Sequence, residues 1–221
     1  ASTSYSGGWF ETTGSGFIPN CVGVDLASAY PYVMAHLPDT SKGYWVGGDE
    51  EEAWWNWMET REPFSLGFCE ASIVFKEGLN WHPLVKKSPT GTLVSPRIIR
   101  GWFTADEIAE AKQWPHESFI VGEWVYFREE SAQNRPYRKF IERFYKMKMS
   151  EDKDSPAYQV SKIMINSIYG KTCQAINNQA GKLWNPFYAA TITGGTRARL
   201  AEINRLNDYS AVSFATDGVI F

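Results

Sequence analysis

The stretch from residue 162 to residue 171 reads Lys-Ile-Met-Ile-Asn-Ser-Ile-Tyr-Gly-Lys. Lys162, Asn166 and Tyr169 are spaced i, i+4 and i+7, so they share one face of a predicted helix. An ammonium, an amide and a phenol on one face suit a polyphosphate with a sugar and a base behind it. The alternative is an amphipathic helix whose apolar side packs in the core, and both interpretations can hold at once. That apolar side consists of Ile163, Met164 and Ile168.

The segment that contains this stretch is basic. Residues 135–171 hold nine basic and four acidic side chains, a net charge of +5, whereas the whole chain carries −3. A concentrated positive segment on an acidic body is a candidate phosphate site, although charge alone does not separate it from a solvated helix face. Helical periodicity over residues 131–149 and 156–169, with a polar stretch between, predicts two antiparallel helices. The second helix is expected to end at Gly170 as its C-cap.

The composition is that of a globular protein with an aromatic core. The 221 residues are 43% hydrophobic and 21% charged, which allows one substantial core or two small ones. Ten Trp residues predict that large flat side chains carry much of the packing. No run approaches the roughly eighteen apolar residues of a membrane span, and the N-terminus does not resemble a signal peptide. We therefore expect no membrane partner and a cytoplasmic location.

Cysteine and histidine spacing points away from a metal centre built on these residues. The cysteines are odd in number and far apart, which favours buried free thiols in a reducing compartment over a disulfide framework or zinc site. The histidines also lack ligand spacing. Any metal chemistry should therefore rest on carboxylates. The residues concerned are Cys21, Cys69, Cys173, His36, His82 and His116.

Two carboxylates lie where predicted strands end. Asp25 closes a predicted buried strand over residues 20–26, and Asp217 belongs to an Asp-Gly pair between hydrophobic runs, which is a hairpin signal. Neighbouring strands could bring both carboxylates to a shared divalent cation, because Mg²⁺ is usually bound by one or two carboxylates plus substrate phosphates. The alternatives are a helix N-cap for Asp25 and a turn residue for Asp217.

The remaining chain mixes strand and helix patterns, which predicts an α+β fold. An acidic start opens a predicted helix near Asp49, and a capping box opens another at Thr104. A further helix is expected to end at Asn207. Strand-like patterns cover residues 66–75, 93–102 and 123–127.

Four segments resemble motifs of the family B DNA polymerases. Residues 25–31, Asp-Leu-Ala-Ser-Ala-Tyr-Pro, look like motif A, Asp-x-x-Ser-Leu-Tyr-Pro, and residues 162–170 match motif B, Lys-x-x-x-Asn-Ser-x-Tyr-Gly. Residues 215–217, Ala-Thr-Asp, resemble motif C, Asp-Thr-Asp, with its first Asp replaced. Residues 5–8, Tyr-Ser-Gly-Gly, look like the Tyr-x-Gly-Gly motif. The motif order, and the long insertion between motifs A and B, are similar to the protein-primed branch of phages and plasmids.

The resemblance implies the palm and fingers of a polymerase without its exonuclease and thumb. It implies an antiparallel palm sheet with packed helices, a two-helix fingers hairpin and an α/β insertion. We expect a fragment, or one half of a split polymerase that binds primer–template weakly until a second chain supplies the remainder. The implied divisions are residues 1–40 and 172–221 for the palm, 41–130 for the insertion and 131–171 for the fingers.

The implied activity is DNA-templated transfer of a nucleotide from a dNTP to a primer 3′-hydroxyl, with two Mg²⁺ ions or Mn²⁺ as an alternative. Asp25 and Asp217 would be catalytic and would bind the metals together with the Leu26 carbonyl. Tyr30 would lie under the sugar and exclude a 2′-hydroxyl. The implied partners are primer–template DNA, dNTPs and a terminal protein primer, in the host cytoplasm if the protein is viral.

The resemblance also implies further contact residues and one departure. Ala215 removes a carboxylate, so the alternative is a catalytically weak or inactive polymerase-derived subunit that binds DNA. The residues implied for dNTP binding are Tyr30, Lys162, Asn166, Tyr169 and Lys148, with Lys146 as an alternative to Lys148. The residues implied for DNA binding are Tyr5, Gly7, Gly8, Gly170 and Lys171.

Overall fold

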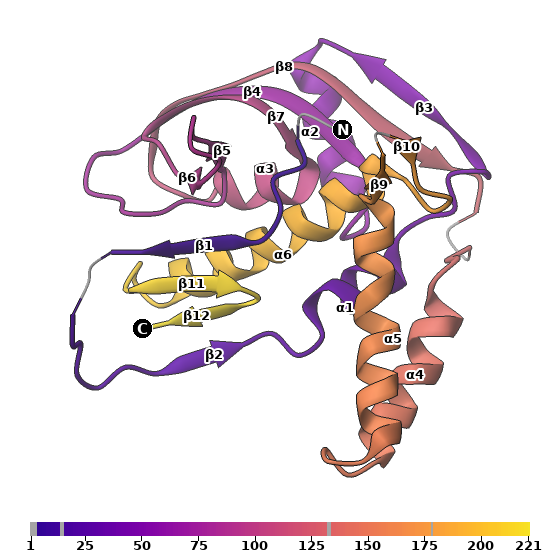
Figure 1. Cartoon of the computed structure of the whole chain (residues 1–221). Coiled ribbons are helices and arrows are strands. Elements are labelled where there is room, and N and C mark those ends of the chain that lie inside the picture. The colour runs from indigo at the N-terminus through magenta and orange to yellow at the C-terminus, as the bar shows by residue number, and fades with distance from the viewer. Residues whose placement is uncertain (1–3, 14–15, 132–133, 178) are drawn as a thin grey trace.

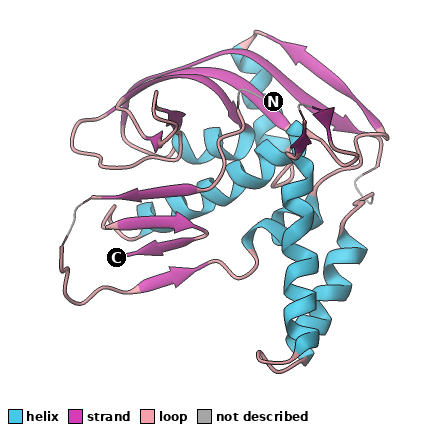
Figure 2. Cartoon of the chain, in the orientation of Figure 1, coloured by secondary structure: helices cyan, strands magenta, loops and turns pink. Residues whose placement is uncertain are grey.

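The computed structural model describes residues 4–13, 16–131, 134–177 and 179–221 (Figure 1). Over these residues the chain forms two four-stranded antiparallel sheets, two small hairpins and six helices (Figure 2). The expected α+β class with antiparallel sheets is confirmed. None of the helices in the described part of the chain is long and apolar enough to cross a membrane.

The first sheet joins the two ends of the chain. Its strand order is β1-β11-β12-β2, and every neighbouring pair is antiparallel. One face is buried: Phe214 and Val219 are almost inaccessible, and the Trp9 ring stacks on Phe214 with centroids 3.9 Å apart. The strands are β1 (Trp9–Thr12), β11 (Ser213–Thr216), β12 (Gly218–Ile220) and β2 (Gly23–Asp25).

The second sheet is built from the middle of the chain and has the order β3-β8-β4-β7. Strand β4 alternates buried and half-buried residues along most of its length, as expected for a sheet with one face on the core. Trp57 stacks on Tyr126 at 4.5 Å, and Trp54 is fully buried, which agrees with the predicted aromatic packing. The strands are β3 (Gly43–Gly48), β8 (His116–Glu129), β4 (Gly67–Phe75) and β7 (Ile98–Thr104).

Helix α6 (Pro186–Leu206) packs against strands of both sheets. It is buried over most of its length and contacts both β7 and β12. Its neighbours include α1 (Ala29–His36) and α3 (Ala105–Ala111), and α3 opens with the capping box predicted at Thr104. Helix α2 (Glu51–Thr60) covers part of β8.

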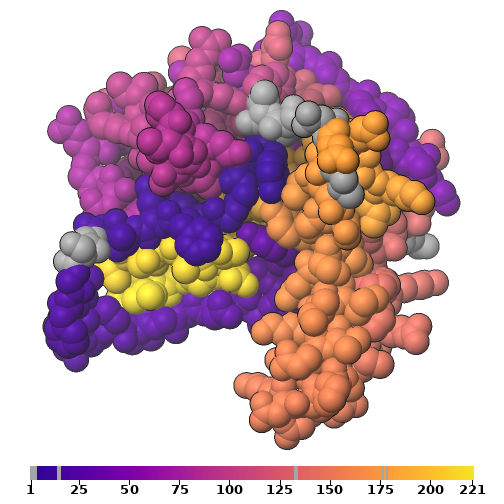
Figure 3. Space-filling model, viewed as in Figure 1, coloured from indigo at the N-terminus to yellow at the C-terminus, as the bar shows by residue number. Residues whose placement is uncertain are grey.

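The helices α4 (Arg138–Ser150) and α5 (Pro156–Thr172) form an antiparallel pair whose far end projects from the body (Figures 1 and 3). Pro156 occupies the first turn of α5, and the Ser155 side chain accepts a hydrogen bond from the Tyr158 N–H. The two expected helices are therefore confirmed, although α4 begins later than predicted. Two hairpins complete the fold: β5 (Lys86–Lys87) with β6 (Leu93–Val94), and β9 (Ala175–Ile176) with β10 (Gln179–Ala180).

Two expectations about α5 are corrected. The helix does not end at Gly170 but continues to Thr172, where the buried Thr172 hydroxyl donates to the Tyr169 carbonyl at 2.7 Å. The apolar side packs only in part as predicted: Ile168 packs against the core, but Ile163 is 64% exposed, and the fully buried residue is Ile165. Helix α5 packs on α4 and α1 through the stripe that contains Ile165, so the contacts with those helices decide which apolar residues are covered.

Three local expectations on the strands and cysteines are also corrected. The strand predicted as buried at 20–26 is the short edge strand β2, whose three residues are exposed. The strand predicted at 93–102 splits into β6 and β7 around Pro96, which has no N–H for a ladder. The three cysteines are free, but only Cys69 is buried: Cys21 is exposed on the loop before β2, and Cys173 is half-buried.

Candidate active site

Asp25 and Asp217 come to neighbouring positions at one edge of the first sheet. Asp25 pairs with Gly218 across β2 and β12, and Asp217 is the preceding residue. The Leu26 N–H donates to the Asp217 carbonyl at 2.9 Å, which ties the two segments together. Burial raises the pKa of Asp217, and the negative charge of Asp25 raises that pKa further. The two carboxylates therefore lie close enough to interact.

A tight turn presents Asp217. Ala215 and Gly218 form the last cross-strand pair, so Thr216 at the end of β11 and Asp217 make the turn, and the Asp217 N–H donates to the Ala215 carbonyl at 2.7 Å. The hairpin is as predicted, but Gly218 is the first residue of β12 rather than part of the turn. Thr216 adopts a φ of 59°, which is rare for a β-branched residue and indicates that the surroundings impose this turn.

Ala215 lies on the same open face as Asp25. The register forms the cross-strand row Phe10, Ala215, Gly218 and Asp25, and side chains in one such row point to one face of a sheet. Ala215 and Phe10 are exposed on that face. A carboxylate at position 215 would face the same space, so with Ala215 there Asp25 is the one carboxylate in this cross-strand row.

A cluster of tyrosines borders the carboxylates. The Tyr30 and Tyr169 rings lie 4.5 Å apart, and the Tyr5 and Tyr169 hydroxyl oxygens lie 3.1 Å apart. A Cβ on Gly8 would stand only 3.2 Å from the Tyr30 hydroxyl and 3.3 Å from Thr216, so the glycine backbone packs directly on both. Segments that are far apart in sequence therefore meet beside Asp217.

The tyrosine hydroxyls are held neutral. Burial is the main cause that raises the pKa of Tyr30 and Tyr169, and it also raises the pKa of Tyr5. The charge of Asp217 adds to the upward shift at Tyr30, whereas Arg197 opposes it. Neutral phenols keep their hydrogen-bond donors, so this cluster can donate to a sugar or a base.

The predicted nucleotide-binding residues other than the tyrosines lie in two places. The Lys148 ammonium donates to the Ser28 hydroxyl at 3.2 Å, between Asp25 and Tyr30 in the chain. Lys162 and Asn166 are exposed, two turns and one turn along α5 from Tyr169.

The other predicted DNA-contact residues border the tyrosine cluster. The Lys171 ammonium donates to the Gln174 side chain at 2.9 Å. Gly7 adopts the left-handed region with a φ of 61°. Open space surrounds Gly170, because a Cβ there would meet no heavy atom within 4 Å.

Sequence reasoning missed a buried ion pair under this cluster. The Arg197 and Glu107 side chains are both 1% exposed and approach to 2.7 Å, and an Arg197 N–H also donates to the Gly7 carbonyl at 2.6 Å. The available signal was a single charged residue in a helical run of small and apolar residues, positions 189–198. Such a residue must be paired when it is buried.

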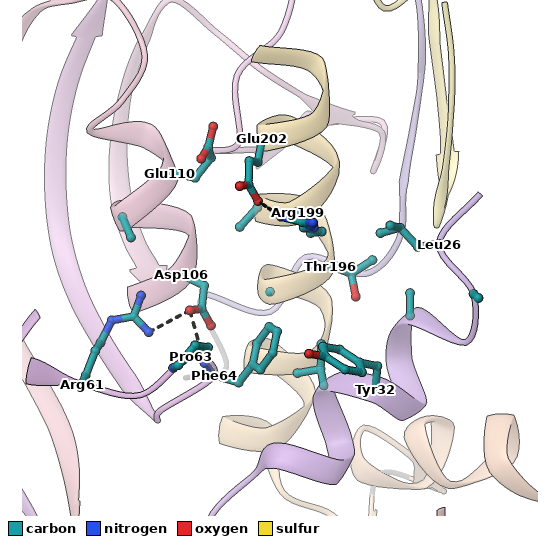
Figure 4. Close-up of a pocket in the computed structure, with 16 residues that line it drawn as sticks. Leu26, Tyr32, Arg61, Pro63, Phe64, Asp106, Glu110, Thr196, Arg199 and Glu202 are labelled. Carbon is teal, nitrogen blue, oxygen red and sulfur yellow. Dashed lines mark hydrogen bonds and ion pairs between the residues drawn. The ribbon is translucent and has the colours of Figure 1, made fainter. Parts of the chain in front are cut away.

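A cavity of about 610 Å³ opens behind the site, between α1, α3 and α6 (Figure 4). Arg61 and Asp106 approach to 2.8 Å at its wall, and the Arg199 and Glu202 side chains form a second pair. The Phe64 ring lies against Gly195, where a Cβ would come within 2.9 Å of it. The charges on the wall are largely neutralised by one another.

The residues present suit a cation only in part. Among the described residues, no group of three or more His, Cys, Asp or Glu side chains could hold a metal ion. A divalent cation beside Asp25 and Asp217 would need backbone, water or substrate oxygens as further ligands. Carboxylate oxygens are hard ligands of the kind that Mg²⁺ prefers, and the charge of Asp25 lies near enough to Asp217 to raise the pKa of Asp217.

A comparison with models of protein families shows to which family this chain belongs. The model described as "DNA polymerase type B, organellar and viral" matches residues 3–185. The chain belongs to the organellar and viral type B DNA polymerase family. The resemblance predicted from its motifs is therefore confirmed, including its restriction to part of a polymerase.

Named relatives of this type B polymerase chain are longer proteins. The DNA polymerase of Acidianus bottle-shaped virus (isolate Italy/Pozzuoli) is 28% identical over 226 residues, which cover 98% of this chain and 32% of that protein. The probable DNA polymerase of Ascobolus immersus is 27% identical over 173 residues, which cover 76% of this chain and 13% of that protein. The chain thus spans a third or less of the length of these relatives.

Solved structures show the same fold. Phi29 DNA polymerase matches with a TM-score of 0.68 at 17% identity, covering 98% of this chain and 42% of that one. The phi29 enzyme complexed with primer–template DNA and incoming nucleotide substrates matches with a TM-score of 0.68 at 16% identity, covering 99% and 42%. Identities this low establish the fold of the type B polymerase chain and nothing more.

Proposed function

We propose that this chain is the palm and fingers portion of a DNA-templated DNA polymerase that transfers a nucleotide from a dNTP to a primer 3′-hydroxyl. The observation that carries the proposal is the meeting of Asp25 and Asp217 beside the cluster of Tyr5, Tyr30 and Tyr169. Family membership supports it. In this proposal residues 1–40 and 172–221 form the palm, 41–130 the insertion and 131–171 the fingers.

The carboxylate pair gives the proposal its metal site. Asp25, Asp217 and the Leu26 carbonyl would hold two Mg²⁺ ions, or Mn²⁺. Bound there, the ions would neutralise the triphosphate and make the primer hydroxyl a better nucleophile. The protein contributes the fixed turn at Thr216 and the cross-strand pairing of Asp25, which keep both carboxylates in place before substrate arrives.

The nucleotide would bind between the tyrosine cluster and the basic face of the fingers. Tyr30 is packed between the Tyr169 ring and Gly8, so its ring cannot easily move aside for a 2′-hydroxyl. Asn166 and Tyr169 would line the nascent base pair. The ammonium groups of Lys162 and Lys148 would neutralise the triphosphate, because ammonium groups pair well with phosphate oxygens.

The template would run along the glycine-rich turn and the end of α5. Tyr5, Gly7 and Gly8 form one wall, and Gly170 offers open backbone on the other. Lys171 adds a positive charge beside Gly170. Such contacts go to phosphate, sugar and base faces and leave sequence to base pairing.

The experiment that tests this function is single-turnover primer extension with excess protein, at increasing Mg²⁺ concentrations. Excess protein offsets the weak primer–template binding expected of this chain without a second chain, so wild type should extend the primer slowly. Asp217→Asn should extend it at least about a thousandfold more slowly than wild type, because metal ions stabilise the transition state by several kcal/mol. Asp208→Asn is the matched control, since Asp208 is exposed in the turn after α6. Equal loss in both variants, or unchanged extension by Asp217→Asn, would contradict the proposal.

A second candidate function is a polymerase-derived subunit that binds DNA but does not extend it. Ala215 favours this candidate, because it leaves the open face of the sheet without a carboxylate at that position. Wild type that binds primer–template yet extends nothing at any Mg²⁺ or Mn²⁺ concentration would support it. The protein primer, the second chain and the cytoplasmic location stay predictions of the resemblance.

A further inference from the structure

We propose that the cavity between α1, α3 and α6 is a binding site for a small uncharged aromatic molecule that carries an N–H or O–H donor. The side chains that line this cavity are different from those proposed above for nucleotide and DNA binding. The inference therefore goes beyond the proposed function and does not depend on it.

The size and the walls of the cavity are those of a small-molecule site. Its volume of about 610 Å³ lies within the range of roughly 300–1,000 Å³ that is usual for ligand pockets, which combine apolar walls with a few polar groups. Three packed helices contribute most of the apolar wall, so the cavity exists before a ligand arrives. The apolar wall contains Leu26, Ala27, Ala29, Val33, Ala109 and Ala198.

Two aromatic rings border the cavity. The Phe64 and Tyr32 rings lie side by side and almost perpendicular, with centroids 5.8 Å apart and an interplanar angle of 89° (Figure 4). Phe64 has a φ of 62°, which is rare for a bulky residue, and its N–H donates to Asp106 Oδ1 at 3.4 Å. The surroundings therefore fix the Phe64 ring at this wall. An aromatic ligand can contact the face of one ring and the edge of the other.

The charged side chains on the wall are already paired. Arg61 and Asp106 are 9% and 11% exposed and approach to 2.8 Å, so this pair is largely shielded from water. A charged ligand would have to break a pair or lie beside apolar residues without an opposite charge, and both cost free energy. The cavity therefore favours an uncharged ligand. The pairs are Arg61–Asp106, Arg199–Glu202 and Arg205–Glu110.

One polar atom offers an anchor for the ligand. Asp106 Oδ2 is buried and has no hydrogen-bond partner among the described residues, whereas Oδ1 accepts from both Arg61 and the Phe64 N–H. A Cβ on Gly195 would stand 3.6 Å from Oδ2, so this oxygen lies toward the α6 wall of the cavity. An unpaired buried carboxylate oxygen costs free energy, and an N–H or O–H of the ligand would supply the missing partner.

The test uses 1-aminoanthracene, a flat uncharged aromatic amine whose fluorescence rises in apolar surroundings. The probe is titrated into the full chain, into Ala109→Phe and into Ala157→Phe. Ala109 lies on the wall, so a phenyl ring there fills part of the cavity. Ala157 is the matched control, because it is also a half-buried alanine in a helix but does not line the cavity.

Wild type and Ala157→Phe should bind one molecule of the probe with equal affinity. Ala109→Phe should bind it at least about tenfold more weakly, because the added ring takes up space that the ligand needs. Absence of binding to wild type, equal affinity of wild type and Ala109→Phe, or equal weakening in both variants would overturn the proposal.

Displacement of the probe by three naphthalenes of similar size tests the preference for an uncharged ligand. The uncharged 1-naphthylamine should displace the probe at least about tenfold better than the 1-naphthalenesulfonate anion or the 1-naphthylmethylammonium cation, because no opposite charge is free on the wall to receive either ion. Equal displacement by either ion would contradict the assigned ligand class.

A measurement on wild type covers loss of folding in Ala109→Phe. Ring currents of the bound probe should shift the NMR methyl resonances of Leu26 and Val33 on the wall, whereas those of Val160, exposed on α5, should not move. Shifts at Val160 without shifts at Leu26 and Val33 would place the probe outside the cavity and refute the site. These measurements do not use primer extension, so a failure of the proposed function would leave their outcome unaffected.

Discussion

Tyr30 shows how single residues are constrained in this site. Its ring rests on Tyr169 and its hydroxyl touches the backbone of Gly8, so three separate segments define its position. Two residues along the same helix, Tyr32 is 58% exposed. The two tyrosines are chemically identical, and their surroundings decide that only Tyr30 faces the proposed sugar site.

Replacing Tyr30 with valine should raise the ratio of ribonucleotide to deoxyribonucleotide incorporation by about tenfold or more, because the ring that blocks a 2′-hydroxyl is removed. Competitive primer extension with the two nucleotide types gives this ratio. Tyr32→Val is the control on the same helix and should leave the ratio unchanged. If Tyr30→Val lowers stability but not selectivity, the ring serves packing alone.

At the scale of elements, glycines in helices have opposite roles. Gly194 in α6 lets the helix approach the Thr104 capping box, where a Cβ would stand 2.4 Å from the Thr104 hydroxyl oxygen. Gly170 in α5 faces open space. The same substitution should therefore have opposite effects on stability in the two helices.

Gly194→Ala should lower the free energy of unfolding by about 1–3 kcal/mol, because the added methyl forces α6 away from α3. Gly170→Ala should raise it by roughly 0.5–1 kcal/mol, since alanine favours the helix and meets no neighbour. Urea unfolding followed by tryptophan fluorescence measures both. A stabilised Gly194→Ala would show that the two helices are not closely packed.

Gly170→Ala also separates stability from binding. If the backbone at Gly170 approaches a base pair, the added methyl should weaken primer–template affinity even though the protein becomes more stable. Anisotropy titrations on this variant and on wild type give the difference. Unchanged affinity would remove Gly170 from the proposed DNA surface.

At the scale of the molecule, the two sheets share one core. Trp9, Phe214 and Val219 from the first sheet belong to the same buried cluster as Ile73 and Trp124 from the second. A shared core makes the two sheets unfold together. A change at a buried residue beside the second sheet should therefore alter the stability of the whole chain.

Protonation of His82 at low pH is such a change. The His82 side chain is 1% exposed, stacks on Phe75 at 3.9 Å, and burial lowers its pKa to about 4 from 6.5. Because the unfolded chain binds the proton more tightly, stability is full above pH 6.5 and is lost as pH falls toward 4. The His82 contribution to the loss between pH 7 and pH 5 should be about 2 kcal/mol.

Urea unfolding at several pH values, for wild type and His82→Phe, tests this contribution. Phenylalanine can stack on Phe75 but does not titrate, so the variant should lose less stability than wild type over the same interval. The comparison between the two proteins cancels the carboxylates that also titrate below pH 5. Parallel curves for wild type and variant would show that His82 is not buried in its neutral form.

Much of the local structure and chemistry was predictable because it depends on near neighbours in the chain. The Thr104 capping box, the α4–α5 pair and the β11–β12 hairpin each follow from spacings of a few residues. Motif spacing also singled out Asp25, Asp217 and Tyr30 as candidate site residues. The errors lie where long-range packing decides, as with the exposed Ile163 and the edge strand β2.

The sequence by itself determined the family, most of the helices and strands, and the candidate residues at their ends. The tertiary structure alone decided how these meet: Tyr5 reaches Tyr169 across 164 positions, and Arg197 reaches Glu107 across 90. Periodicity informs only about residues within a few turns, whereas these contacts depend on how α6 packs between the sheets. In the sequence, the buried Arg197 is the one charge in the run of small and apolar residues at positions 189–198, and only the folded chain supplies the carboxylate and the carbonyl that it contacts.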